Sequence, residues 1–139
     1  MRLDRMVGVA AIALLAGCVS TNAAILNPSI KLAPICPDGV QLFTTTDKVG
    51  KDYREIALLN STGETSFTTE QGMYNSLRKK AAELGANGLI LDPINEPKPG
   101  TKVLAAVLGT SAERKGSALA IDIPADSARV REICAVQKK

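Results

Sequence analysis

Apolar residues occur in short blocks along this chain, and the blocks differ in periodicity. Residues 40–45 and 53–60 are rich in β-branched, aromatic and aliphatic residues, which is typical of strands. The run 56–59 (IALL) in the second block indicates burial on both faces of a sheet. Residues 88–91 and 117–123 predict two further short strands, the last with partial alternation of apolar and polar positions.

Helical periodicity is clearest in the middle of the chain. Thr68 is followed three residues later by Gln71, which is typical of a capping box at the start of a helix. Gly85 stands where a left-handed glycine is expected just after a helix. The pattern therefore predicts one main helix over residues 69–84, with an apolar face formed by Met73, Leu77, Ala81 and Leu84.

A long connection of about 20 residues, 95–115, separates the last two predicted strands, and connections of this length are uncommon in a compact domain. Its middle, 103–108 (VLAAVL), is apolar. The favoured interpretation is a short apolar helix that folds back over the open face of the sheet. The alternative is an exposed surface that contacts a partner or a bilayer, formed by Val103, Leu104, Val107 and Leu108.

The elements follow one another in the order β-β-α-β-loop-β, and a short C-terminal helix capped by Asp126 comes after Pro124. This order predicts an α/β fold: a small two-layer sandwich with about four strands in a mixed sheet and one main helix. The main helix is expected to cross between parallel strands. Asp122, an acid flanked by apolar residues in the last strand, is expected on the solvent side.

The N-terminus has the pattern of an export signal. Residues 1–5 are basic, residues 6–16 are apolar apart from two glycines, and small residues follow. The apolar run is too short for a transmembrane helix, which needs about 20 residues. Residues 15–18 (LAGC) resemble the bacterial lipobox, so we expect a lipoprotein signal peptide at 1–17 and lipid, such as palmitate, on Cys18. An ordinary signal peptide that happens to contain a cysteine is the alternative.

Three segments are expected on this basis. Residues 1–17 are the signal, residues 18–35 are the lipidated cysteine with a tether interrupted by Pro28 and Pro34, and residues 36–139 form a single periplasmic domain. As a flexible coil, the tether would span roughly 20–25 Å. The mature chain of 139 − 17 = 122 residues is long enough for one domain.

The cysteines fit an exported protein. If Cys18 carries lipid, Cys36 and Cys134 remain as an even pair, one near each end of the folded region. Such a pair in an oxidising compartment predicts a disulfide, and two free thiols are the alternative.

The composition excludes several kinds of chemistry. The chain has no histidine, which removes the commonest general base and metal ligand. Its carboxylates are scattered, and its glycines lack the spacing of phosphate-binding loops. We therefore expect no catalytic residue, no metal site, no cofactor and no enzymatic activity. The formal net charge is only +3, and no basic stripe interleaved with aromatic residues predicts nucleic-acid binding.

Four stretches carry a resemblance to a known family: 40–44 (VQLFT), 49–56 (VGKDYREI), 86–90 (ANGLI) and 116–121 (GSALAI). Together they resemble the soluble domain of the RcsF-type outer-membrane lipoproteins, envelope-stress sensors of the Rcs phosphorelay, over roughly residues 40–123. The resemblance implies a small α/β sandwich and an Rcs-like sensing role. The chain departs from that family because the cysteines of the family's two disulfides are absent from the corresponding positions.

These observations favour a non-catalytic, membrane-anchored envelope protein that acts through contacts with other envelope proteins, as a stress sensor or an assembly accessory. A small-ligand-binding module with residues 102–109 as a lid, or a purely structural envelope lipoprotein, are the alternatives. Val19, directly after the expected lipidated cysteine, indicates the outer membrane with the domain facing the periplasm, because enteric-type sorting retains lipoproteins with aspartate there in the inner membrane. The partner, the signal and the oligomeric state stay open.

Overall fold

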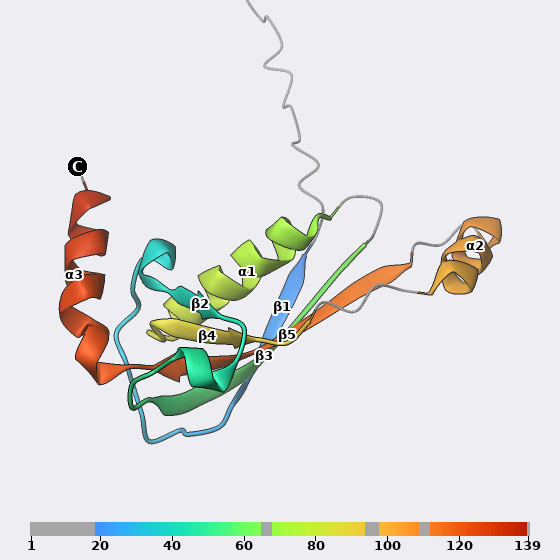
Figure 1. Cartoon of the computed structure of the whole chain (residues 1–139). Helices are drawn as coiled ribbons and strands as arrows, with labels where there is room; N and C mark the ends of the chain where they lie inside the picture. Colours follow the sequence, from blue (N-terminus) through green and yellow to red (C-terminus); the bar gives the residue numbers. More distant parts are fainter. Residues whose placement is uncertain (1–18, 65–67, 94–97, 109–111, 139) are drawn as a thin grey trace, which may run out of the picture.

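The computed structural model describes residues 19–64, 68–93, 98–108 and 112–138, apart from the side chains of Ala105 and Ala106. Residues 1–17, where we expect the signal peptide, and Cys18 lie outside these ranges. Figure 1 shows a twisted sheet with one long helix packed along it. The strands are β1 (Ser20–Ile25), β2 (Gln41–Phe43), β3 (Arg54–Glu64), β4 (Gly88–Leu91) and β5 (Glu113–Asp122). The α-helices are α1 (Glu70–Glu83), α2 (Pro99–Val107) and α3 (Ser127–Val136), and the 3-10 turns are η1 (Pro37–Gly39), η2 (Thr46–Lys48) and η3 (Pro124–Asp126).

The sheet is mixed and has the strand order β1-β3-β5-β4-β2. Every neighbouring pair is antiparallel except β2 and β4, which are parallel. The predicted two-layer α/β fold is confirmed, with five strands instead of about four. Strands β3 and β4 run parallel to each other, as expected of strands joined by the crossover helix α1, but β5 lies between them.

The extra strand corrects the expectation of a tether over residues 18–35. Residues Ser20–Ile25 form edge strand β1, which pairs with β3 from Ser20↔Thr62 to Ile25↔Ala57. Thr21 supplies the contact that the sequence pattern did not reveal: its hydroxyl donates to Ser61 (3.1 Å) and lies 2.6 Å from the Ser76 hydroxyl of α1. The polar first half of the segment thus becomes a strand because it has a partner strand and helix.

The rest of the expected tether also packs on the domain. Ile30, Leu32 and Ile35 lie against the core beneath α1. The backbone N–H of Ile35 donates to the carbonyl of Ala82 in the last turn of α1 (3.0 Å). This bond satisfies one of the carbonyls that a helix end leaves without a partner inside the helix.

Strands β3 and β5 are longer than their apolar blocks. Beyond Leu91, which pairs with Ala118 at the end of β4, β3 and β5 continue as a ribbon whose last pair is Glu64↔Glu113. These residues are polar, so hydrophobic periodicity did not extend the strands over them. The predicted connection 95–115 is accordingly shorter.

Apolar side chains form a core on each face of the sheet. Between the sheet and α1 the core is largely aliphatic, and Leu59, Leu77 and Leu89 are fully buried in it. On the opposite face a smaller cluster, Phe43, Val49, Ile90, Ile121 and Ile123, is covered in part by the chain between β2 and β3.

Helix α1 begins one residue later than the capping-box pattern indicated. Thr69 is the N-cap, and its hydroxyl accepts the N–H of Gly72 (3.0 Å). Thr68 is buried and donates its hydroxyl to the Glu64 carbonyl (2.5 Å). Thr68 is therefore bonded to the end of β3 and is not the N-cap, which corrects the Thr68–Gln71 prediction.

The end of α1 requires glycine for two reasons. Gly85 has φ +78°, in the left-handed region, and a Cβ there would lie 2.4 Å from Leu32 Cβ and 2.6 Å from the Ala33 carbonyl oxygen. Gly50, with φ +62°, shares the backbone conformation but has open space around it. The segment that precedes η1 therefore crosses directly over the C-terminus of α1.

This difference gives a matched pair of variants. Gly50→Ala should lower the free energy of unfolding by about 1–2 kcal/mol, the cost of a left-handed non-glycine residue. Gly85→Ala should cost clearly more, because it also pushes residues 32–33 off α1. Urea denaturation followed by circular dichroism measures both. Equal losses would show that residues 32–33 do not pack on Gly85.

Candidate functional site

The stretches that resemble the lipoprotein family meet at the C-terminal end of β5. Lys51 and Arg54 come from the entry to β3, and Asn87 immediately precedes β4. All three bind residues between Asp122 and Asp126, where the chain leaves the sheet for α3. We refer to Lys51, Arg54, Asn87, Asp122 and Asp126 as the β5 clamp.

Asn87 is the buried centre of the clamp. Its side-chain Nδ2 donates to the carbonyl of Ile123 (2.9 Å), and its Oδ1 accepts the N–H of Ile123 (2.7 Å). The side chain thus pairs with Ile123 as a neighbouring strand would, one residue beyond the end of β5. Ile123 is fully buried, so without Asn87 its N–H would have neither water nor a protein partner, whereas its carbonyl also accepts the N–H of Asp126 (3.0 Å).

Two acids of the clamp are buried and paired with cations. Arg54 binds Asp122 through Nη2 and through Nε (3.1 Å). Asp126 binds Lys51 and lies 3.6 Å from Nη2 of Arg129. Asp122 was expected on the solvent side; that prediction is wrong, because Asp122 is the direct register partner of Arg54 and only 8% exposed.

The geometry of the clamp supports a structural role for it. The five side chains of the clamp are all bonded to partners within the chain. Among the residues that the structure describes, no group of three or more His, Cys, Asp or Glu side chains could hold a metal ion. Sequence reasoning did not pair these residues, although the Lys51-to-Arg54 spacing and the two acids at the end of the last strand were visible.

The role of Asn87 can be tested directly. Asn87→Leu leaves the buried N–H of Ile123 without a partner, whereas the Ile123 carbonyl still accepts the N–H of Asp126 (3.0 Å). We therefore expect a loss of about 1–3 kcal/mol in the free energy of unfolding, the cost of one unsatisfied buried group. Asn60→Leu, at an exposed position of β3, is the control and should change it little. Similar losses in the two variants would rule out the clamp.

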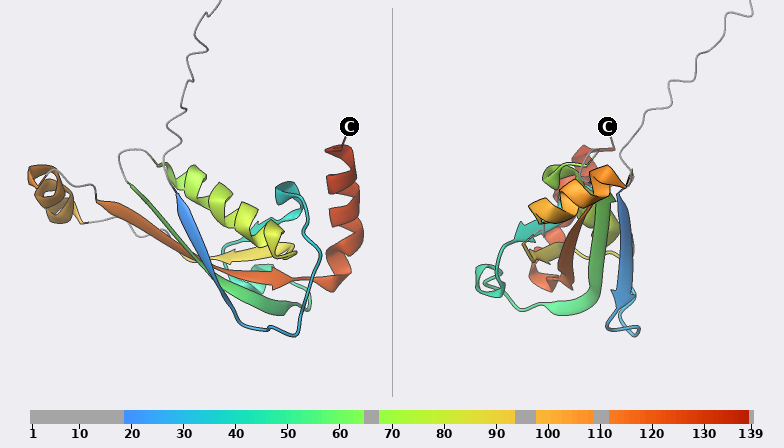
Figure 2. Two further views of the ribbon diagram at one scale, coloured as in Figure 1. Left: turned by 180° about the vertical axis from the view of Figure 1, so that it is seen from behind. Right: turned by 90° about the vertical axis from the view of Figure 1, so that its right-hand side faces the viewer.

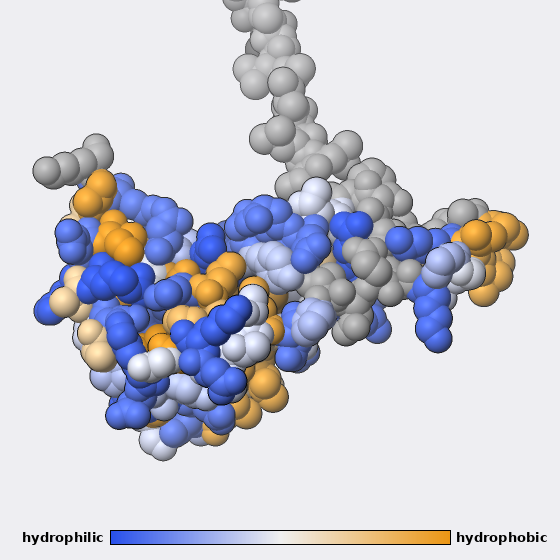
Figure 3. All heavy atoms as spheres, viewed as in Figure 1, coloured by the Kyte–Doolittle hydropathy of each residue, from blue (hydrophilic) through white to orange (hydrophobic). Residues whose placement is uncertain are grey.

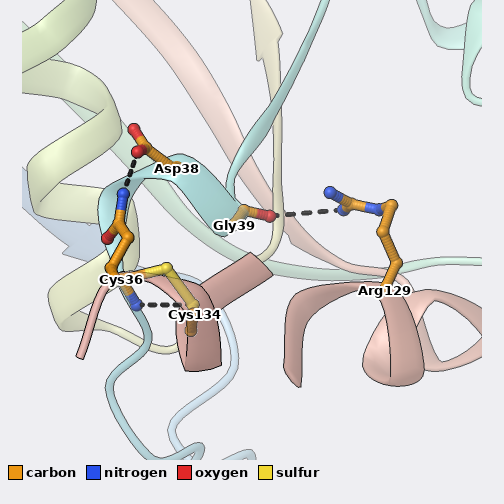
Figure 4. Close-up of a disulfide and its surroundings, with 6 residues drawn as sticks. Cys36, Asp38, Gly39, Arg129 and Cys134 are labelled. Carbon is orange, nitrogen blue, oxygen red and sulfur yellow. Dashed lines mark hydrogen bonds between the residues drawn. A yellow bond between two sulfur atoms is a disulfide. The ribbon is translucent and has the colours of Figure 1, made fainter. Parts of the chain in front are cut away.

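The disulfide predicted between Cys36 and Cys134 is confirmed (Figure 4). The two Cα atoms are 5.5 Å apart, and the bridge fixes α3 to the chain just before η1. Around it, Arg129 Nη2 donates to the Gly39 carbonyl (3.2 Å), and Gln137 donates to Asp38. A Cβ on Gly39 would meet Val130 at 3.2 Å and the Cys134 sulfur at 3.3 Å, so α3 lies close against η1.

A groove of about 620 Å³ runs beside the bridge, between residues 34–36 and α3. Apolar side chains such as Ile35 and Val130 line it together with the cations Arg131 and Lys138. No acid lines it, so it offers an apolar floor with cations at the side and no proton-transfer pair.

Removal of the bridge should be costly, because the two cysteines are 98 residues apart. On the chain-entropy model, closing a loop of this size stabilises the fold by about 4–5 kcal/mol. We expect the Cys36→Ala, Cys134→Ala double variant to lose stability by that order in urea denaturation. Reduction of the native protein with dithiothreitol should shift its midpoint in the same direction, and an unchanged midpoint in both experiments contradicts the prediction.

The apolar residues of the long connection lie on α2, and the structure corrects the favoured interpretation that they cover the sheet. Figures 1 and 2 show α2 beyond the end of the ribbon, away from both faces of the sheet. Val103, Leu104, Val107 and Leu108 are 59–77% exposed. Figure 3 shows an apolar surface over this helix. The open face of the sheet is covered instead by Val49 and its neighbours.

Cys18 lies outside the described residues, so its lipidation stays a prediction from the sequence. Within the described residues, none of the helices is long and apolar enough to cross a membrane.

Tyr74, on α1, is partly buried against the edge of the core, and its surroundings alter its ionisation. Burial raises the pKa of its phenol above 10.0, and the hydrogen bond and negative charge of Glu70 (Oη to Oε1, 2.8 Å) raise it further. The phenol therefore stays protonated near neutral pH. Stability gained from this contact is present below pH 10 and is lost as the pH rises through the raised pKa.

Comparison with known proteins bears on the fold of this chain and on no other property. The crystal structure of FvfA, a Francisella virulence factor, in its orthorhombic form is similar with a TM-score of 0.51. The match has 14% sequence identity and covers 73% of this chain and 96% of that chain. No family model matches this chain, and neither does any curated protein. The likeness supports the α/β architecture described above.

Proposed function

We propose that this protein is a non-catalytic lipoprotein of the bacterial envelope, held by lipid on Cys18 and acting through contacts with other envelope proteins. Envelope-stress sensing, as in the RcsF-type family, or assistance in assembly are the activities that fit this class. The periplasmic side of the outer membrane is the location we propose, from Val19.

The division of the three cysteines carries this proposal. Cys36 and Cys134 are joined to each other. Cys18 is then the single cysteine outside the bridge, and it stands at the end of the lipobox-like sequence LAGC. Disulfides persist in oxidising compartments such as the periplasm, so the bridge and the export signal support the same destination.

The β5 clamp supports a role without catalysis. The motif residues that could have suggested chemistry, Lys51, Arg54 and Asn87, are engaged in holding the exit of β5. A rigid domain presented by a lipid anchor acts through its surface. Exposed apolar side chains of the described residues include those of α2 and Val136 at the end of α3. They also include Ile25, Leu26 and Leu58, at the far end of β1 and on its neighbour β3, which are 44–48% exposed.

The anchor is tested by mass spectrometry of the protein purified from bacterial membranes. We expect a mature chain that starts at Cys18 and carries a diacylglyceryl group there, with Cys36 and Cys134 still linked. Cys18→Ser should block lipidation and processing at this position, so the chain should keep residues 1–17 and lack the diacylglyceryl group. A mature chain with unmodified Cys18 would show an ordinary signal peptide and contradict the proposal.

Action by contact is tested by crosslinking in intact cells, followed by purification of the native lipoprotein. We expect adducts with one or a few envelope proteins. These adducts should be lost for Cys18→Ser, which has the same domain without the anchor. Recovery of the lipoprotein free of any envelope protein would contradict the contact hypothesis and leave the anchor standing.

A further inference from the structure

The position of β1 determines how the domain meets its membrane. Val19 alone separates Cys18 from Ser20, the first residue of β1. Ser20 is the register partner of Thr62, and Thr62 is the partner of Lys115. Because residues 20–35 are packed on the domain and do not form a tether, a lipid on Cys18 would hold this end of the sheet against the bilayer.

Helix α2 belongs to the same end of the molecule. It precedes β5, which begins at Glu113, two residues before Lys115. The start of β1 and the start of β5 are therefore at one end of the sheet, and Figures 1 and 2 show α2 beyond that end. Helix α3 follows the opposite end of β5.

The surface of α2 has the chemistry of a helix that lies in a membrane interface. Val103, Leu104, Val107 and Leu108 fall within one face at 3.6 residues per turn, and all are more than half exposed. Lys102 falls on the opposite side of the helix. Interfacial helices combine an apolar face with basic residues that meet anionic lipid headgroups.

The charges near α2 are consistent with this arrangement. Residues 98–108 contain two lysines and no acid. Lys98, directly before α2, and Lys115, on the ribbon, are both exposed. Glu64 and Glu113 also lie on the ribbon, as partners across its last pair. Residues 98–108 thus carry a small positive charge, although Glu96 stands two residues before Lys98 in the sequence.

We propose that α2 is a second membrane contact: its apolar face inserts into the headgroup region of the bilayer that holds Cys18. The inference rests on the proposed lipid anchor. Interfacial helices of this kind bury their apolar side chains roughly 5–10 Å into the headgroup boundary. The two contacts, Cys18 and α2, fix the orientation of the domain, with α3 and the disulfide facing away from the membrane. Ile25, Leu26 and Leu58, toward the far end of β1, then remain for protein contacts.

The protein has no tryptophan, so a single introduced tryptophan reports its own surroundings. Leu104→Trp places the probe on the apolar face of α2. Val136→Trp is the matched control, because Val136 is a 72% exposed apolar residue at the end of α3. Each full-length variant is produced with its signal, purified as the lipoprotein and reconstituted into vesicles of phosphatidylethanolamine and phosphatidylglycerol, with and without bromine on the acyl chains.

We expect insertion to shift the emission of Leu104→Trp to shorter wavelength in vesicles than in detergent-free buffer. Bromine on the acyl chains should then remove most of this emission. Emission of Val136→Trp should be the same in both kinds of vesicle. Val107→Glu, added to Leu104→Trp, should restore most of the emission, because a carboxylate on the apolar face opposes insertion.

The outcomes separate the two proposals. If Leu104→Trp emits equally in both kinds of vesicle while the chain is lipidated and vesicle-bound, the α2 contact is overturned and the anchor stands. Crosslinking of α2 to a second copy or to another protein would then identify what covers it. Quenching of both tryptophans to the same extent overturns the orientation and with it the inference. A purified chain without lipid on Cys18 overturns the proposed function, and the membrane arrangement falls with it.

Discussion

The structure depends on the antiparallel pairing of β3 with β5, which runs from Arg54↔Asp122 to Glu64↔Glu113. These two strands occupy the middle of the sheet, and every other strand is attached directly or indirectly to them: β1 on the outer edge of β3, and β4 followed by β2 on the other edge of β5. Alternation along the pair supplies apolar residues to both faces, so α1 covers one core and the chain before β3 covers the other. Pairing two segments far apart in sequence carries a loop-closure cost that grows only slowly with the length of chain between them, and α1 and β4 lie within that length.

The ends of this central pair are secured by different means, and the difference suits the proposed function. At the C-terminal end of β5, ion pairs between buried acids and half-exposed cations, the Asn87 side chain and the disulfide beyond them hold α3 to the sheet. At the other end, the β3–β5 ribbon extends past the last residue of β4. Helix α2, whose apolar residues are exposed, precedes β5 at this end. One end of the molecule is thus held by several bonds, and the other carries the exposed apolar residues of α2. This arrangement suits the proposed action by contact, because a surface held by a rigid core loses less conformational freedom on binding.

Particular residues show how far sequence patterns reached. Sequence patterns predicted the main helix and the short strands at 88–91 and 40–45, because each depends on local periodicity. They also predicted the Cys36–Cys134 pair, because two cysteines remain once Cys18 is set aside. The edge strand β1 and the extensions of β3 and β5 were not, because their residues are polar or weakly alternating and become strands only beside a partner. Asp122 was misplaced for the same reason: its burial follows from Arg54 standing opposite it, and register between distant strands is absent from a local pattern.

The sequence by itself determined the class of fold, the position of α1, the disulfide and, through the LAGC sequence, the expectation of a lipid anchor, because these follow from composition and from residues close together in the chain. Only the tertiary structure decided that residues 20–35 pack on the domain and that α2 stays clear of the sheet. Both outcomes depend on competition for the same surfaces: β3 offers a free edge that β1 occupies, and Val49 with its neighbours occupies the face that α2 would have covered. The same apolar residues can therefore be core or contact surface, and only the packing of the whole chain distinguishes the two.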